Sequence, residues 1–412
     1  MTTANRLSRN TLILLVSNIG SALLLFALSA IIGRAYGKEG LGVYSTAMAW
    51  VFPLSLIAEF GLNTLLTREI ARQPERERAY LTTAVHARLW IAGGLALALI
   101  IIAPLLSRDA LLVQGIRISA PLILVLPLFG TLTAIFRARQ VMWPIPWLNL
   151  GMLVAQLVLT AWAVLSGGDI LLLLIVNTFT SIAQLGAAWL LWRRLFHVTS
   201  PTGSGSSHSI TSILWQAWPF AVAAILAAVQ TRLGTILLEQ MADTTAAGSY
   251  AAAARFVEAG RMIPNALFGA LFPALAALAQ QPTALNNLFR KILGLLASFG
   301  LLAGIVCTLF ASTLITLTYG SDFTDAAPIL TLSMWSLLPS LLRSGIGLYW
   351  YAVGRESWVN RVTIIALLIQ FVLSLLLIPA YGGQGAASAI VLTETISTIL
   401  LGWPLRTHHA RR

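Results

Sequence analysis

Long apolar runs alternate with short polar stretches along almost the whole chain. The runs are about as long as the ~20 residues that an α-helix needs to cross a bilayer. The pattern therefore predicts an all-α integral membrane protein. The expected membrane-spanning helices, about twelve in number, are Thr11–Ile32, Leu41–Leu66, Ala84–Leu106, Leu112–Ile135, Trp143–Leu165, Ile170–Trp192, Ile213–Leu238, Ser249–Ala276, Leu288–Thr318, Ala326–Val353, Val359–Ile378 and Gln384–Trp403.

The middle of the chain divides these predicted helices into two sets of six. The segment Thr199–Ser209 (TSPTGSGSSHS) is rich in Gly and Ser, a composition typical of flexible linkers. We therefore expect an N-terminal six-helix lobe at 1–198, a cytoplasmic linker at 199–209 and a C-terminal six-helix lobe at 210–412.

Short sequence matches relate the two halves. Gly42-x-Tyr44 opens the second predicted helix, and Gly248-x-Tyr250 opens the eighth, 206 residues later. The fifth and eleventh predicted helices are each preceded by an Arg and a Trp, namely Arg139 with Trp143 and Arg355 with Trp358. Such matches suggest parallel repeats, which in transporters form the substrate site where the repeats meet.

Composition and charge support the membrane assignment. Hydrophobic residues make up 58% of the chain and charged residues only 10%, whereas soluble domains carry about 25% charged residues. The net charge of +12 does not indicate nucleic-acid binding, because the basic residues lie between apolar runs. Eighteen of the 26 Lys and Arg residues, Arg88 among them, lie near the ends of the predicted spans on one side of the membrane, and four lie on the opposite side. The positive-inside rule then predicts cytoplasmic termini.

The most charged stretch, Arg68–Tyr80 (REIARQPERERAY), is expected to be a solvated cytoplasmic loop. The single Cys307 excludes a disulfide within one chain. The sequence contains no CxxC pair, HExxH, Walker loop or GxGxxG–strand unit, and its five His residues lack metal-ligand spacing. We therefore predict no catalytic residue and no metal site.

Charged residues inside one apolar run are the strongest functional signal. The run Gly248–Pro273 carries Arg255, Glu258, Arg261 and Asn265, which fall within an arc of about 120° on a helix. A charge at the bilayer centre costs about 2.5–3.5 kcal/mol on insertion scales, so such groups normally face a protein interior or a wet cavity. The alternative is that neighbouring charges, spaced i,i+3, pair and hold helices together.

Other polar residues at bilayer depth extend this set. The candidates to bind an anionic head group are Arg232, Arg255, Arg261 and Arg343. The candidates to bind a proton or cation, or to orient the arginines, are Glu59, Glu258 and Glu394. The candidates for further polar groups in a cavity are Asn63, Gln230 and Asn265. For Glu59 a structural hydrogen bond between helices is the alternative, and for Arg343 it is a snorkelling side chain beside Gly345 and Gly347.

Four stretches resemble Wzx-type polysaccharide or O-antigen flippases, which belong with MATE exporters and lipid II flippases to the MOP superfamily. They are GLGVYSTAMAWVFPLSLIAEFGLNTLLTREIAR (Gly40–Arg72), GSYAAAARFVEAGRMIPNALFGALFPAL (Gly248–Leu275), YGSDFTDAAPILTLSMW (Tyr319–Trp335) and LLLIPAYGGQGAASAIVLTETI (Leu375–Ile396). The resemblance implies a V-shaped transporter of about twelve helices in two six-helix lobes, with a positively charged central cavity.

The resemblance also implies a cargo and a location. The cargo is an undecaprenyl-pyrophosphate-linked oligosaccharide, used to make O-antigen (part of lipopolysaccharide), capsule or exopolysaccharide. The protein would move it by alternating access from the cytoplasmic to the periplasmic leaflet of the bacterial inner membrane. Implied partners are membrane lipid and the polysaccharide polymerase machinery, with no cofactor, and coupling to an H⁺ or Na⁺ gradient is left open. Arg255 and Glu258 match charged positions of the family, as does Arg232. Where the family often has an acid two residues later, this chain has Gly234.

Two other classes of protein compete with this interpretation. A MATE-like cation-coupled exporter of small molecules should have an acidic lumen, whereas here four Arg face three Glu at bilayer depth. A membrane-embedded polysaccharide polymerase or glycosyltransferase needs an exposed catalytic loop. The longest predicted loops have only about a dozen residues and no Asp-x-Asp pair, so the chain is not expected to be an enzyme.

Overall fold

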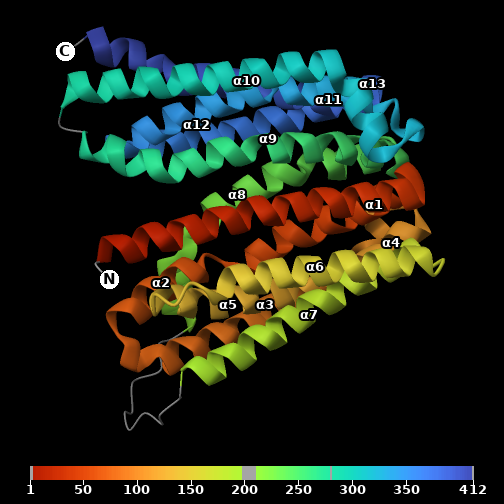
Figure 1. Ribbon diagram of the computed structural model, residues 1–412, viewed down its shortest axis with the longest axis horizontal. Coiled ribbons are helices and arrows are strands. Elements are labelled where there is room, and N and C mark those ends of the chain that lie inside the picture. Colours follow the sequence, from red (N-terminus) through yellow and green to blue (C-terminus); the bar gives the residue numbers. More distant parts are fainter. Residues whose placement is uncertain (1–2, 197–209, 279–280, 411–412) are drawn as a thin grey trace. The chain divides into compact units, whose positions relative to one another are not determined.

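The computed structural model describes residues 3–196, 210–278 and 281–410, so the predicted linker 199–209 lies outside the described residues. Within these ranges the regular structure is entirely helical (Figure 1). The helices are α1 (Thr3–Glu59), α2 (Leu62–Arg72), η1 (Pro74–Arg76), α3 (Glu77–Leu106), α4 (Ala110–Ser119), α5 (Leu122–Ala138), α6 (Pro144–Leu165), α7 (Ile170–Leu195), α8 (Ile210–Met241), α9 (Thr244–Ala277), α10 (Pro282–Tyr319), η2 (Ser321–Phe323), α11 (Ala326–Trp335), α12 (Leu337–Ala352) and α13 (Glu356–Ala410).

Two of the helices are each interrupted by a glycine. Gly37 in α1 has φ 66° and ψ −164°, and Gly382 in α13 has φ 52° and ψ −128°. Glycine adopts positive φ readily because it lacks a Cβ. Each glycine falls between two of the predicted spans, so α1 and α13 each supply two of them.

Three predicted spans are instead made of two helical pieces. The second predicted span breaks at Phe60 and Gly61, which both have positive φ. The fourth passes from α4 to α5 at Pro121, and the tenth passes from α11 to α12 at Ser336. Proline has no N–H to continue the helical hydrogen-bond ladder. Pro121 lies at the joint between α4 and α5, and Pro339 lies about one turn after the joint at Ser336.

The predicted spans all fall on observed helices. Among the described residues, eight helices are long and apolar enough to cross a membrane, and two of them, of 56 and 49 residues, contain the glycine interruptions. The all-α membrane fold predicted from the sequence is confirmed.

The chain forms two compact units. Unit 1 comprises Met1–Leu28 and Thr46–Arg232, and unit 2 comprises Ser29–Ser45 and Leu233–Arg412. The helices α1 and α8 therefore run from one unit into the other. Unit 2 gains from the first half of the chain a short segment that contains Gly37.

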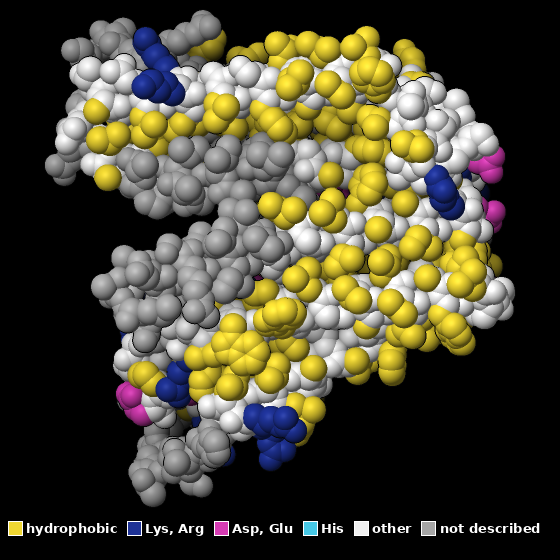
Figure 2. Space-filling view, in the orientation of Figure 1, with side chains coloured by type: hydrophobic (Ala, Val, Ile, Leu, Met, Phe, Trp, Pro, Cys, Tyr) yellow, Lys and Arg dark blue, Asp and Glu magenta, His cyan; other side chains and the backbone are white. Residues whose placement is uncertain are grey.

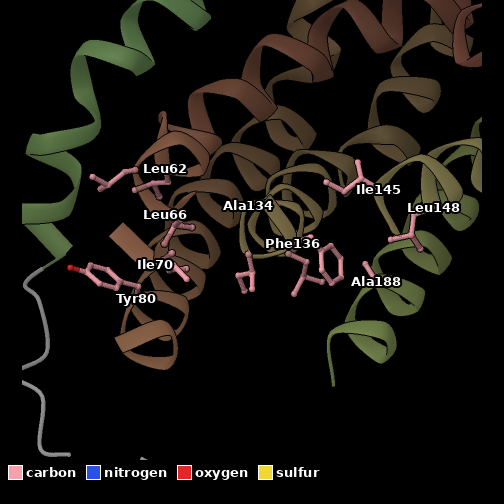
Figure 3. Packing of buried hydrophobic residues seen from close by; sticks show 13 residues of the cluster. Leu62, Leu66, Ile70, Tyr80, Ala134, Phe136, Ile145, Leu148 and Ala188 are labelled. Atoms are coloured by element: carbon pink, nitrogen blue, oxygen red, sulfur yellow. The ribbon is translucent and has the colours of Figure 1, made fainter. Parts of the chain in front are cut away.

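The core of unit 1 forms around α2 (Figure 3). Leu62, Leu65, Leu66 and Ile70 lie on one face of this short helix and are buried, as expected of an amphipathic helix. They belong to one cluster with Phe136 of α5 and with apolar residues of α3, α6 and α7.

The stretch Arg68–Tyr80 is helical rather than a loop and only partly solvated: Arg68, Arg72, Glu75 and Arg78 are exposed as its charge suggests, but part of it is buried. It contains the last turns of α2 and the start of α3, and Ile70, Glu77 and Tyr80 are buried. The Glu77 carboxylate accepts hydrogen bonds from Arg139 Nε at 2.8 Å and from Trp192 Nε1 at 3.2 Å. A buried charge is tolerated when it is paired and hydrogen-bonded in this way, so Glu77 joins α3 to α5 and α7.

Large apolar side chains cover the outside of both units (Figure 2). Trp90, Leu105, Leu165 and Leu317 are each at least 72% exposed. A water-soluble monomer rarely exposes such extensive apolar surface. The exposed side chains match the hydrocarbon core of a bilayer.

Candidate intramembrane site

Arg255 and Glu258 form an ion pair on α9 in unit 2. Arg255 Nη1 lies 2.7 Å from Glu258 Oε2, and the side chains are 18% and 39% exposed. One helical turn separates the two residues, so they lie on the same side of the helix. The pair predicted as the alternative has formed, yet the carboxylate remains partly accessible. The guanidinium is therefore held in one orientation beside a partly accessible carboxylate.

Two tyrosines accompany this pair. Tyr44 and Tyr319 lie close enough to Arg255 to interact with it electrostatically, and both are buried. The ring of Tyr319 also meets Phe256 edge-on, with ring centroids 6.4 Å apart. The charged pair thus sits against a packed aromatic wall on the same unit.

Arg261 follows Arg255 on α9 by six residues. Its Nε is buried and makes no hydrogen bond to the described residues. The side chain of Asn265, the fourth member of the predicted polar arc, lies outside the described residues.

Arg343 and Glu394 bind each other across α12 and α13. The Glu394 carboxylate accepts from Arg343 Nε at 2.7 Å and from Nη2 at 3.1 Å. A two-point contact of this kind is among the strongest side-chain hydrogen bonds. The structure brings these two candidates together in an ion pair, in which each side chain neutralises the charge of the other.

Glu59 and Asn63 meet an arginine that the sequence analysis did not select. Arg88 of α3 is fully buried, although the charge pattern placed it on a cytoplasmic face. It donates from Nη2 to Asn63 Oδ1 at 2.8 Å and to the Glu59 carbonyl oxygen at 3.5 Å. It also donates from Nη1 to the Pro127 carbonyl and to Thr131 Oγ1. The Glu59 carboxylate hydrogen-bonds to Asn63 and feels the charge of Arg88.

A signal for Arg88 was present in the sequence. Tyr80, Ala84, Arg88 and Ala92 follow one another at i,i+4, and all four are buried on α3. The predicted helix began at Ala84, so this face was not recognised. A helix started at Glu77 would have placed Arg88 on its buried face.

Arg232 and Gln230 lie on α8 and belong to unit 1, whereas Arg255, Arg261 and Arg343 belong to unit 2. Arg232 also packs over the ring of Phe52, with its Cζ 5.4 Å from the ring centroid. That some of these four arginines converge on one chamber stays a prediction.

Gly234, the position at which the resemblance leads us to expect an acid, has a packing role. A Cβ at this position would lie 2.9 Å from the hydroxyl oxygen of Tyr250. Even a methyl group would force Tyr250 to move, so the tyrosine occupies the space that an acidic side chain would need. Among the described residues, no group of three His, Cys, Asp or Glu could hold a metal ion.

The long apolar helices make this a multi-pass membrane protein, and comparison with solved structures gives it the fold of MOP-superfamily transporters. A lipid II flippase, MurJ, in an inward-closed conformation superposes with a TM-score of 0.80 over 95% of this chain and 87% of its own, at 15% identity. An inward-facing multidrug resistance MATE transporter gives a TM-score of 0.75 over 95% of both chains, at 13% identity. These likenesses establish the fold.

Sequence comparison identifies the family. The model of the family "Polysaccharide biosynthesis protein" matches residues 7–279, which is more than half of the chain. The chain therefore belongs to that family. The capsular polysaccharide biosynthesis protein CapF of Staphylococcus aureus is 24% identical over 183 residues, which span 44% of this chain and 46% of CapF.

Proposed function

We propose that this protein is a flippase that moves an undecaprenyl-pyrophosphate-linked oligosaccharide from the cytoplasmic to the periplasmic leaflet, for polysaccharide biosynthesis. The observation that carries the proposal is the pre-oriented guanidinium of Arg255, which the partly accessible Glu258 holds in place on a helix at bilayer depth. Membership of the polysaccharide biosynthesis family and the flippase-like fold support it.

The chemistry of the cargo fits this group. A pyrophosphate is anionic, and a guanidinium can donate two parallel hydrogen bonds to it. Glu258 holds Arg255 in one orientation before the cargo arrives, which lowers the ordering cost of binding. Arg261, one and a half turns further along α9, is the second phosphate ligand in this proposal. Arg343 serves to join α12 to α13, since Glu394 already occupies it.

For coupling to an H⁺ or Na⁺ gradient, Glu59 is the carboxylate that we propose. Glu258 and Glu394 each bind a guanidinium in an ion pair, and neutralising either would release an arginine charge. Glu59 instead hydrogen-bonds to the neutral amide of Asn63, with Arg88 nearby. It can therefore change its charge while Arg88 keeps its other partners.

The first test removes the proposed phosphate ligand. Arg255→Ala should abolish surface glycan in cells that depend on this protein, and lipid-linked oligosaccharide should accumulate on the cytoplasmic side. A hydrogen bond to a charged group contributes about 1.5–3 kcal/mol, so cargo affinity should fall roughly 10- to 150-fold. Arg255→Lys should restore part of the export, because it keeps the charge without the fork.

Arg108→Ala is the matched control, because this exposed arginine lies in the turn between α3 and α4. Normal glycan in the Arg255→Ala cells, at equal protein level, would contradict the proposal. Unchanged glycan together with a higher sensitivity to cationic drugs would favour a MATE-like exporter instead.

A further inference from the structure

Ser29–Ser45 comes from the first half of the chain but packs as a part of unit 2. It contains the end of the first span, the interruption at Gly37 and the start of the second span. In Figure 1 the start of α9, the end of α10 and the start of α11 lie at one end of unit 2. The segment contacts all three helices there, as its individual contacts show.

The segment and α9 touch backbone to backbone. A Cβ built on Gly42 would lie 1.9 Å from the carbonyl oxygen of Thr244, and a Cβ built on Gly248 would lie 1.9 Å from that of Lys38. Carbon and oxygen atoms that are not bonded normally stay more than about 3 Å apart. Any residue larger than glycine at either position must therefore push the two helices apart.

These two contacts are equivalent under the internal repeat. Residue 248 is the counterpart of residue 42 at the offset of 206, and residue 244 is the counterpart of residue 38. Gly42 therefore contacts Thr244, the counterpart of Lys38, and Lys38 contacts Gly248, the counterpart of Gly42. This is the pattern of a two-fold symmetric interface, formed here within one chain.

Arg34 fastens the segment to the end of α10. It donates from Nε to the Thr318 carbonyl oxygen at 2.8 Å and from Nη2 to the Leu317 carbonyl oxygen. These carbonyls lie in the last turn of α10, where acceptors lack helical partners and the helix dipole is negative. The Ser29 hydroxyl adds a hydrogen bond of 3.0 Å to the Tyr319 hydroxyl.

An ion pair completes the attachment. Lys38 Nζ lies 2.6 Å from Asp325 Oδ1, and the same carboxylate accepts from the Ser249 hydroxyl at 3.0 Å. Ser249 follows Gly248 on α9, so Asp325 bridges the two helices directly beside the glycine crossing. Half of the Asp325 side chain is exposed, so solvent screens the pair and it can be broken readily.

We propose that Ser29–Ser45 is a latch, which holds the first two spans against α9 and α10 at this end of unit 2 and releases them during transport. This inference rests on the proposed flippase function. Tyr319 of α10 binds Ser29 of the latch through a hydrogen bond and also packs edge-on against Phe256, the neighbour of Arg255 on α9. Cargo that binds at Arg255 therefore disturbs the packing of Tyr319 and weakens its contact with the latch.

The test measures opening of the latch without cargo. In a Cys307→Ala background, Ser249→Cys places a thiol at a buried position of α9, beside the latch. Gly42→Ala should open the crossing, so a membrane-impermeant maleimide should label this thiol at least ~10-fold faster. Gly93→Ala is the matched control, because a Cβ there meets nothing within 4 Å, and labelling should stay slow. Equal labelling in the two variants would overturn the latch.

A thiol at buried Ser181 of α7 shows whether Gly42→Ala simply unfolds the protein, because it should stay protected. If it is labelled too, the charge pair decides the question. Lys38→Glu should then speed labelling of Ser249→Cys, and adding Asp325→Lys should restore protection. Failure of this rescue would refute the latch.

A final measurement links the latch to export. A short bifunctional thiol reagent that joins Lys38→Cys to Asp325→Cys should stop glycan export, and each single cysteine variant treated in the same way should still export. Export that continues in the cross-linked protein would disprove the release step. The labelling results need no cargo, so they stand or fall independently of Arg255→Ala.

Discussion

A single buried arginine shows how this protein places charge at bilayer depth. Arg88 is fully buried and donates to acceptors on α2 and α5 and at the end of α1. Water cannot replace these partners inside the bundle. Removing one partner of a buried charge network costs about 3–5 kcal/mol.

We therefore expect Arg88→Ala to lower the thermal unfolding temperature of the purified protein and its level in the membrane. Arg88→Lys should rescue little, because an ammonium group cannot donate to four acceptors in the fixed geometry of a guanidinium. Arg78→Ala, at an exposed position on the first turn of the same helix, is the control. An unfolding temperature of Arg88→Ala equal to that of the control would show that the network does not stabilise unit 1.

At the scale of helices, polar pairs join neighbours that lipid cannot drive together, because lipid tails are as apolar as the side chains. Arg343 and Glu394 join α12 to α13, and Gln156 Nε2 donates to Asn177 Oδ1 at 2.9 Å between α6 and α7. Such pairs fix which helices pack together and in which register.

The Arg343–Glu394 pair makes a prediction that separates packing from transport. Arg343→Met and Glu394→Gln should each destabilise the protein, because each leaves one polar partner buried and unpaired. The double variant should be more stable than the sum of the two effects implies, and it should still export glycan. Thermal unfolding gives the coupling, and surface glycan gives the function. A stable double variant without export would instead assign Arg343 or Glu394 to the transport path.

The sequence predicts the helices better than their contacts. The spans follow from apolar length, and the interruptions near Gly37 and Gly382 follow from glycine in short, less apolar turns. Arg255 and Glu258 were found because their charges stand out in an apolar run. Glu77 was missed because it lies within a highly charged stretch, and Arg88 was missed because it follows that stretch. Only tertiary packing shows that their charges are buried and bound by partners.

At the scale of the whole molecule, the exposed apolar surface and the distribution of basic residues predict one orientation in the membrane. The even number of predicted spans puts both termini on the same side, and the basic residues make this the cytoplasmic side. A reporter that works only in the cytoplasm should be active when it is fused to either terminus. A reporter that works only in the periplasm should be inactive at both termini. A reporter that is active in the periplasm at either end would reverse the proposed direction of transport.

The glycine crossing also constrains how such a chain can evolve. Gly42 and Gly248 occupy equivalent places in the predicted repeat, and each lies against the backbone of the other half's sequence. A mutation that adds a side chain at one site displaces the helix that carries the other, so the two sites cannot change independently of each other.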